Sequence, residues 1–287
     1  MTRRNVYQVS DWNGISGERW VSNQARLDVM LAPFGDAALE TAAPQAGERV
    51  LDVGCGAGTQ TFEIGRQVGP RGHVLALDIS TPLVERARQT MPSNLPVTFD
   101  VADVSVAPLP VQALDLLYSR FGVMFFDDPV AAFSHMRLSL RPGGRLAFVC
   151  WRSAAENDWV RLPMGAIKGI VPPSAPPPAD APGPFSFGDR ARVEGIVAAA
   201  GFVECQMRPF DHTIHFGLGE SRDAAVADAV NMAFEVGPLS RALADQSEVI
   251  RERARLAVHS AFAARPGERS VQIEGAAWIV TARNPGL

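Results

Sequence analysis

The stretch Arg49–Thr61 constrains this chain more than any other. It reads Arg-Val-Leu-Asp-Val-Gly-Cys-Gly-Ala-Gly-Thr-Gln-Thr, and apolar residues at helical spacing follow it. The pattern predicts a buried strand, a glycine turn and a helix start. Glycines let the backbone approach a ligand closely, and the free N–H groups of a helix start point toward that ligand. The stretch therefore predicts a site for an anionic or polar ligand.

The spacing of the glycines restricts which ligand this is. A dinucleotide-binding turn needs Gly-x-Gly-x-x-Gly, but counting from Gly54 the third glycine should fall on Thr59. Gly54, Gly56 and Gly58 alternate instead, and Asp52 precedes them by two residues. This arrangement resembles the first motif of the class I S-adenosylmethionine (SAM) methyltransferases. The resemblance implies that the loop wraps the methionine end of SAM, with the acidic residue favouring the ammonium group.

Composition and charge exclude several other classes of protein. The 287 residues are 47% hydrophobic and 20% charged, which is the balance of a globular protein with a sizeable core. The net charge of −4 offers no basic surface for nucleic acid. No apolar run approaches the ~18 residues of a membrane span, and no signal peptide is expected. Three cysteines without a Cys-x-x-Cys pair favour a reducing compartment, so we expect a cytoplasmic protein.

Strands and helices alternate from Gly47 onward, which predicts an α/β fold with a parallel sheet. The resemblance implies a Rossmann-like, doubly wound sheet of seven mostly parallel strands with an antiparallel last strand. We expect four regions: an N-terminal helical arm or lid (1–46), the SAM-binding core (47–152), a proline-rich flap (153–188) and the remainder of the domain (189–287) with a helical insert at 221–265. Pro33 is expected to interrupt the arm's helical pattern. The arm either packs on the surface of the domain or forms a lid in which Trp12 or Trp20 faces substrate or cofactor.

Acidic residues also follow the next two predicted strands. Asp78 lies 20 residues after Gly58, at the end of a strand, where an acid can accept hydrogen bonds from ribose hydroxyls. Dinucleotide-binding proteins share this feature, so it indicates a nucleoside without identifying it. Asp103 follows the third strand at the same edge of the sheet. The resemblance implies that Asp78 binds the ribose, that the adjoining Ile79 also contacts the cofactor, and that Asp103 and Val104 bind adenine.

The resemblance extends through two further motifs. The fourth predicted strand runs into Ser119-Arg-Phe-Gly-Val-Met-Phe-Phe, and Arg-Pro-Gly-Gly-Arg at 141–145 precedes the fifth. Over residues 47–151 the order of motifs is similar to the small-molecule methyltransferases, above all the branch of the ubiquinone/menaquinone C-methyltransferases. It implies that Ser119 lies near the sulfonium methyl and that Arg120 and Phe121 form the floor between cofactor and acceptor. The expected activity is methyl transfer to O, N or C of a small organic molecule, releasing S-adenosylhomocysteine (SAH).

A base or an anion-binding group is the remaining chemical requirement. His212 and His215, at the end of the predicted sixth strand, are the candidate bases. Arg120 and Arg152, at strand ends, are candidates for holding an anionic substrate group. No histidine–carboxylate cluster has the spacing of a metal site, so no metal is expected.

Three alternatives remain open from the sequence. They are a dinucleotide-dependent oxidoreductase, a non-catalytic SAM-binding subunit, and a methyltransferase acting on nucleic acid, which the acidic charge disfavours. The acceptor, the methylated atom and the oligomeric state, including a homodimer, are not determined at this level.

Overall fold

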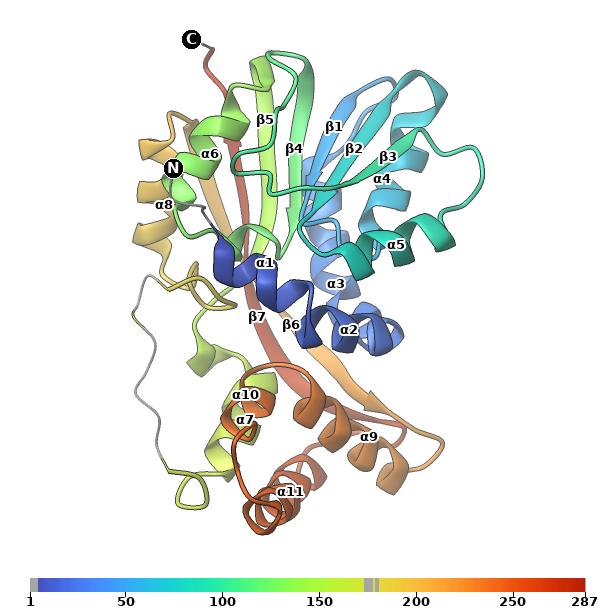
Figure 1. Cartoon of the computed structure of the whole chain (residues 1–287), viewed down its shortest axis with the longest axis vertical. Helices are drawn as coiled ribbons and strands as arrows, with labels where there is room; N and C mark the ends of the chain where they lie inside the picture. Colours follow the sequence, from blue (N-terminus) through green and yellow to red (C-terminus); the bar gives the residue numbers. More distant parts are fainter. Residues whose placement is uncertain (1–4, 173–177, 179–180, 287) are drawn as a thin grey trace.

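The computed structural model describes residues 5–172, 178 and 181–286, which build one seven-stranded sheet flanked by helices (Figure 1). The strands are β1 (Arg49–Val53), β2 (His73–Asp78), β3 (Val97–Val101), β4 (Leu114–Arg120), β5 (Leu140–Trp151), β6 (Val203–Leu218) and β7 (Ser270–Arg283). Their order in the sheet is β3-β2-β1-β4-β5-β7-β6. The first five strands run parallel, and β7 lies antiparallel to both β5 and β6. The predicted fold class is therefore confirmed.

Helices cover both faces of this sheet. They are α1 (Val6–Trp12), α2 (Ile15–Ser22), α3 (Gln24–Ala42), α4 (Thr59–Val68), α5 (Thr81–Thr90), α6 (Pro129–Arg137), α7 (Asp158–Ala166), α8 (Arg190–Ala199), α9 (Arg222–Glu235), α10 (Pro238–Ala242) and α11 (Glu248–Ala263). Crossovers between parallel strands are right-handed, so the chain order and the sheet order put α4 and α5 on one face and α6 on the other. The arm helix α3 packs beside α4, and α8 packs beside α6.

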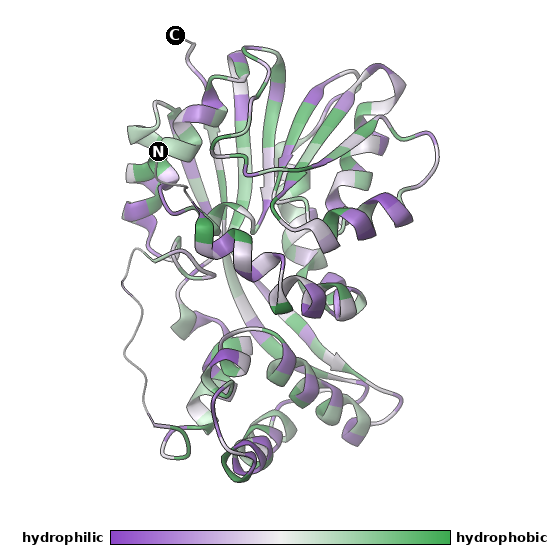
Figure 2. Ribbon diagram, viewed as in Figure 1, coloured by the Kyte–Doolittle hydropathy of each residue, from purple (hydrophilic) through white to green (hydrophobic). Residues whose placement is uncertain are grey.

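The core lies along the central strands. Residues 114–119 of β4 and residues 146–151 of β5 are all buried, as expected for strands enclosed on both faces. Figure 2 shows that hydrophobic residues predominate along these central strands. Contrary to expectation, Pro33 does not interrupt the arm, because α3 runs through it. The neighbouring Leu31 and Phe34 are buried against the sheet, and this packing outweighs the hydrogen bond that proline cannot donate.

The strands β6 and β7 extend past the rest of the sheet. β5 pairs with β7 only as far as Trp151 and Ala277, whereas the β6–β7 pairing continues to Leu218 and Ser270. Helix α9 packs on this extension, and α7, α10 and α11 complete a lobe around it at the bottom of Figure 1. This lobe adjoins the carboxyl ends of the parallel strands, which is the edge where open α/β sheets bind ligands.

The segment 153–188 contains more regular structure than its prolines suggest. Helix α7 forms within it and accommodates Pro163. Residues 173–177 and 179–180 of the proline-rich run lie outside the described residues, and the division of the chain into arm, core, flap and remainder stays a prediction. In the described part of the chain, every helix lacks either the length or the apolar character needed to cross a bilayer.

Candidate functional site

The glycine turn after β1 has the tight geometry that its sequence predicts. Gly54 and Gly56 have φ angles of 68° and 55°, in the left-handed region that favours glycine. A Cβ on Gly54 would lie 2.8 Å from the Cα of Gly122, so the loops after β1 and β4 approach too closely for a side chain. A Cβ on Gly56 would meet no heavy atom within 4 Å, and Gly56 lines a cavity. Gly54 therefore allows close packing, and Gly56 leaves space beside the loop for a ligand.

Asp52 lies in β1 just before this turn and is only 2% exposed. The Thr61 hydroxyl in α4 donates a hydrogen bond of 2.5 Å to its Oδ2. Burial raises the pKa of Asp52 to about 6, although the Thr61 hydroxyl and the Arg120 guanidinium favour the charged form. Asp52 lines the cavity, so a cationic ligand there would stabilise the carboxylate.

Asp78 ends β2 and links that strand to the glycine turn. Its Oδ2 accepts a hydrogen bond of 2.8 Å from the Gly56 backbone N–H, and its Oδ1 accepts one of 2.8 Å from that of Ser80. Burial raises the pKa of this carboxyl as well. Asp78 and Ile79 both line the cavity, and the remaining lone pairs of the carboxylate can accept bonds from ligand hydroxyls.

Asp103 follows β3 and is held by a residue that the sequence analysis missed. The Asn5 Nδ2 donates to both Asp103 oxygens, at 3.0 and 2.9 Å. Asn5 and Asp127 also form two hydrogen bonds with each other. The Asn5 backbone N–H donates to the Asp127 carboxylate, and the Asp127 backbone N–H donates to the Oδ1 of Asn5. Asp103 and Val104 line the cavity beside Asn5. No sequence pattern indicated that the segment before α1 reaches the end of the third strand.

The N-terminal helices bridge the sheet and the lower lobe. Asn13 Nδ2 donates to the Ile79 carbonyl at 2.7 Å, and its Oδ1 accepts from the Thr81 backbone N–H at 2.9 Å. Farther along, the Arg19 Nη1 donates to the Ser240 hydroxyl at 2.6 Å, in the lower lobe. The arm therefore crosses the carboxyl edge of the sheet and forms one wall of the cavity.

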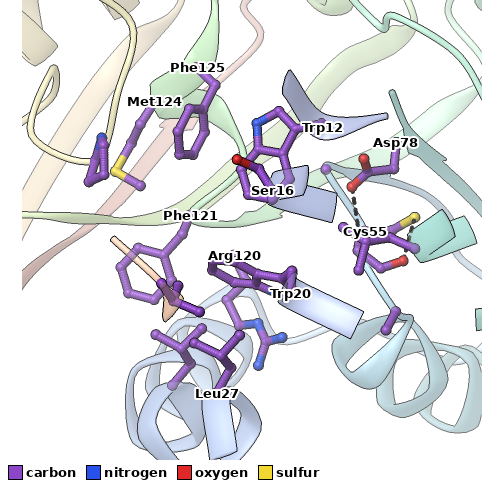
Figure 3. A pocket seen from close by; sticks show the side chains of 18 of the residues that line it. Trp12, Ser16, Trp20, Leu27, Cys55, Asp78, Arg120, Phe121, Met124 and Phe125 are labelled. Carbon is purple, nitrogen blue, oxygen red and sulfur yellow. Dashed lines mark hydrogen bonds between the residues drawn. The ribbon is translucent and has the colours of Figure 1, made fainter. Parts of the chain in front are cut away.

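The same cavity continues from the three acids into a chamber with mostly apolar walls. Figure 3 shows Asp78 and Cys55 on one side of it and Phe121, Met124 and Phe125 on the other, with Trp12 and Trp20 between them. Further apolar lining comes from Leu27, Met30, Leu31, Phe126, Trp151, Trp159, Phe216, Met232 and Val236. Both arm tryptophans thus line the cavity.

Phe121 forms part of the chamber wall in an unusual backbone conformation. Its φ of 62° is rare for a bulky side chain. The Phe121 N–H donates to the Val149 carbonyl at 3.0 Å, and its ring stacks on Trp151 with centroids 4.3 Å apart. These contacts hold the ring where the loop after β4 meets the end of β5.

Two residues expected to touch the cofactor do not line the cavity. The buried Ser119 hydroxyl donates to the Val53 carbonyl at 2.7 Å and accepts from the Gly122 N–H at 3.1 Å, so it joins the loops after β1 and β4. Gly58 lies at the start of α4, where a Cβ would fall 2.8 Å from the Phe62 ring. Both residues therefore support the loops that line the cavity and do not border it themselves.

The two candidate bases also lie outside the cavity lining. Phe216 lines the cavity, and because neighbouring residues of a strand point to opposite faces, His215 points away from it. The Nδ1 of His215 lies 2.9 Å from the Ser270 hydroxyl. His212 is exposed, with its ring beside Phe210 and Phe34. The geometry therefore lends no support to either histidine as the base, and that assignment stays a prediction.

The two candidate arginines differ in position. Arg152 forms ion pairs with Asp211 and Glu156 and does not line the cavity. Arg120 does line it, and its Nη2 lies 3.2 Å from the Oδ1 of Asp28 in α3. Asp28, like Asn5, is a cavity residue that sequence reasoning missed, because its position in an arm helix carries no motif.

Comparisons with known proteins agree with this geometry. A sequence profile of a methyltransferase domain matches residues 50–144. An uncharacterized methyltransferase of Mycobacterium tuberculosis (strain ATCC 25618 / H37Rv) is 32% identical over 149 residues, which are 49% of this chain and 74% of that protein. This chain belongs to the SAM-dependent methyltransferases.

Other relatives of this methyltransferase match over a smaller share of their length. The aklanonic acid methyltransferase DauC of Streptomyces sp. (strain C5) is 34% identical over 130 residues, which are 44% of this chain and 59% of that protein. The chain thus spans less than two thirds of that relative.

The crystal structure of the YcgJ protein from Bacillus subtilis shares the fold. It aligns with a TM-score of 0.56 at 15% identity, covering 88% of this chain and 98% of that one.

Membership in this family confirms the resemblance inferred from the motifs. It identifies SAM as the methyl donor and removes the support for a dinucleotide-dependent oxidoreductase. The narrower likeness to the ubiquinone/menaquinone branch stays a prediction.

Proposed function

We propose that this methyltransferase transfers the methyl group of SAM to an O, N or C atom of a small, largely apolar organic molecule, releasing SAH. One observation carries the proposal. A single cavity joins the acids at the ends of β1, β2 and β3 to the aromatic chamber that the arm and the lower lobe help to enclose. In this proposal the polar end of the cavity holds the nucleoside, and the adjoining apolar end holds the acceptor.

The residues at the nucleoside end fit SAM in their chemistry. Asp52 offers a buried carboxylate to an ammonium group, Asp78 offers lone pairs to ribose hydroxyls, and Asp103 offers them to the adenine amine. The space beside Gly56, which a Cβ would fill, matches a ligand lying against the loop. We assign Gly54, Ile79 and Val104 as further lining of this subsite.

When bound, SAM supplies a methyl group on an activated sulfonium, so the reaction is an in-line displacement. The chain's own contribution is then to orient the acceptor and to exclude water. Phe121 and Trp151 supply a rigid aromatic wall for orientation. The arm, attached through Asn13 to the sheet and through Arg19 to the lower lobe, acts as the lid that excludes water.

The cofactor assignment is tested at Asp78. Because this carboxylate would bind ligand hydroxyls, Asp78→Ala should weaken SAH binding by about 1–2 kcal/mol, or roughly tenfold. Calorimetric titration with SAH measures this effect. Asp100→Ala is the matched control, since Asp100 is a β3 carboxylate whose side chain is 58% exposed and lies outside the cavity lining. Unchanged affinity in a folded Asp78→Ala variant would remove the ribose assignment.

The activity itself is tested by transfer of a labelled methyl group from SAM to phenols and quinols. Transfer to any of them supports the proposed function. Tight SAH binding without transfer to any acceptor would favour the non-catalytic SAM-binding subunit.

We further propose that the protein works in the cytoplasm, with no nucleic-acid partner. Cys55, Cys150 and Cys205 are free thiols, and the first two are buried with pKa values raised by burial. Unpaired thiols of this kind suit a reducing compartment. The net charge of −4 argues against a nucleic-acid surface.

A further inference from the structure

Arg120 is a buried cation with only part of its hydrogen-bonding capacity used. Its side chain is 14% exposed, and its Nη2 lies 3.2 Å from the Oδ1 of Asp28. Its Nη1 is buried and has no hydrogen-bond partner among the described residues. Leaving a buried charged donor unpaired is costly, so this nitrogen is suited to a ligand atom that accepts a hydrogen bond.

Asp28 cannot readily satisfy this second nitrogen. Its other oxygen, Oδ2, already accepts a hydrogen bond of 2.9 Å from the Thr59 hydroxyl at the start of α4. The Arg120–Asp28 contact is therefore single and not the paired, fork-like contact that arginine makes with carboxylates. One edge of a planar guanidinium remains available, and its geometry matches a second carboxylate.

A second unpaired donor lies in the same cavity. The Nε1 of Trp159, in α7, is buried without a hydrogen-bond partner in the described part of the chain. The ring is fixed by packing, with its centroid 5.5 Å from that of Trp151 and 5.4 Å from that of Phe185. An indole N–H can only donate, so it too requires an acceptor atom from the ligand.

Both donors line the chamber, and the Arg120 guanidinium also lies close enough to Asp52 to favour its charged form. Arg120 directly precedes Phe121, whose ring stacks on Trp151, and Trp151 in turn contacts Trp159. Figure 3 places Arg120 beneath Trp20 and well apart from Asp78. Other charged groups of the chamber already have partners, as Arg19 bonds to Ser240. The chamber thus combines flat aromatic walls with one incompletely paired cation and one neutral donor.

We propose that the methyl acceptor is a flat aromatic acid, an inference that rests on the proposed function. Its carboxylate accepts a hydrogen bond from the Nη1 of Arg120, and a second oxygen accepts one from the Nε1 of Trp159. The ring system packs against Phe121 and Trp151. A carboxylate is also present in the methionine moiety of SAM, so the experiment has to distinguish these two sources.

The test uses SAH-saturated protein and two probes that differ in a single group, the carboxylate of 1-hydroxy-2-naphthoate and the neutral amide of 1-hydroxy-2-naphthamide. Binding is measured by calorimetry and by quenching of tryptophan fluorescence. We expect the wild-type protein to bind the acid about tenfold more tightly than the amide. This comparison needs no variant and is independent of turnover.

Variants then assign the preference to particular residues. The double variant Arg120→Met with Asp28→Asn removes the cation together with the charge of its ion-pair partner, and it should lose the preference for the acid. Trp159→Phe keeps an aromatic side chain, although a smaller one, and removes the donor, so it should weaken both probes about threefold. Arg152→Met is the control, because Arg152 lies outside the cavity lining and its loss should preserve the preference.

The outcomes separate this inference from the proposed function. If the SAH-loaded wild type binds the acid and the amide equally, or binds neither, the proposal of an aromatic acid as acceptor is wrong. The proposed methyltransferase function is still supported in that case, because the protein binds SAH. A double variant that loses SAH affinity but keeps the acid preference assigns Arg120 to the cofactor carboxylate and also overturns it. Failure of the wild type to bind SAH contradicts the proposed function itself.

Discussion

Replacing Gly56 by alanine is expected to reduce SAH affinity by more than about a hundredfold while the protein still folds. The new Cβ would meet no protein atom within 4 Å, so the fold bears only the strain of a left-handed φ, about 1–2 kcal/mol. It would, however, occupy the space in which the ligand is proposed to lie against the loop. Calorimetric titration with SAH and thermal unfolding measure the two effects separately.

Two other glycines provide controls for this prediction. Gly143 has a φ of 77° and lies outside the cavity lining, and a Cβ there would also meet no heavy atom within 4 Å. Gly143→Ala therefore reproduces the strain and should keep SAH affinity. Gly54→Ala would press against the Gly122 backbone at 2.8 Å and should destabilise the fold by about 2–4 kcal/mol. Wild-type SAH affinity in Gly56→Ala would show that no ligand lies against this loop.

Asp52→Asn is expected to stabilise the ligand-free protein at neutral pH and to weaken SAH binding about tenfold. In the unfolded chain this carboxyl ionises near pH 4, whereas burial raises its pKa to about 6 in the fold. The favourable contribution of the Asp52 carboxyl to the free energy of unfolding is therefore fully present below about pH 4, and it is lost as the pH rises through about 6. Asparagine carries no charge to bury and can still accept the Thr61 hydrogen bond. The gain above pH 6 should be at most about 3 kcal/mol.

Urea unfolding of both proteins from pH 4 to pH 8 checks the sign of this effect. The difference in free energy of unfolding should be small near pH 4, grow as the pH rises and level off above pH 6. Asp115→Asn is the control, because Asp115 pairs with Arg141 at 2.6 Å and its neutralisation should destabilise the protein at neutral pH. A pH-independent difference for Asp52→Asn would contradict the buried, ionised carboxylate.

The end of the cavity that carries the three acids was predictable because its determinants are local. A strand end, a tight turn and the residue after it are set by neighbouring residues, and parallel strands bring their carboxyl ends to one edge. Asp52, Asp78 and Asp103 therefore come together as their positions predict. Ser119 and Gly58 were placed at the correct loops, but which atoms border the cavity depends on contacts with Val53 and Phe62.

The acceptor end was not predictable in the same way. His215 and Phe216 are adjacent in the sequence, yet only Phe216 lines the cavity, because the register of β6 on β7 determines which face points inward. Asn5, Asp28 and Trp159 reach the cavity from three separate segments that carry no motif.

The sequence by itself thus determined the family, the succession of strands and helices in the first half of the chain and the set of acids that gathers at one edge of the sheet. These features follow from local backbone requirements and short spacings. Only the tertiary structure decided how β6 and β7 extend beyond the sheet, how the arm crosses its edge, and which donors remain unpaired in the chamber. Those properties arise from long-range packing, in which residues far apart in the chain meet because their apolar faces are buried together.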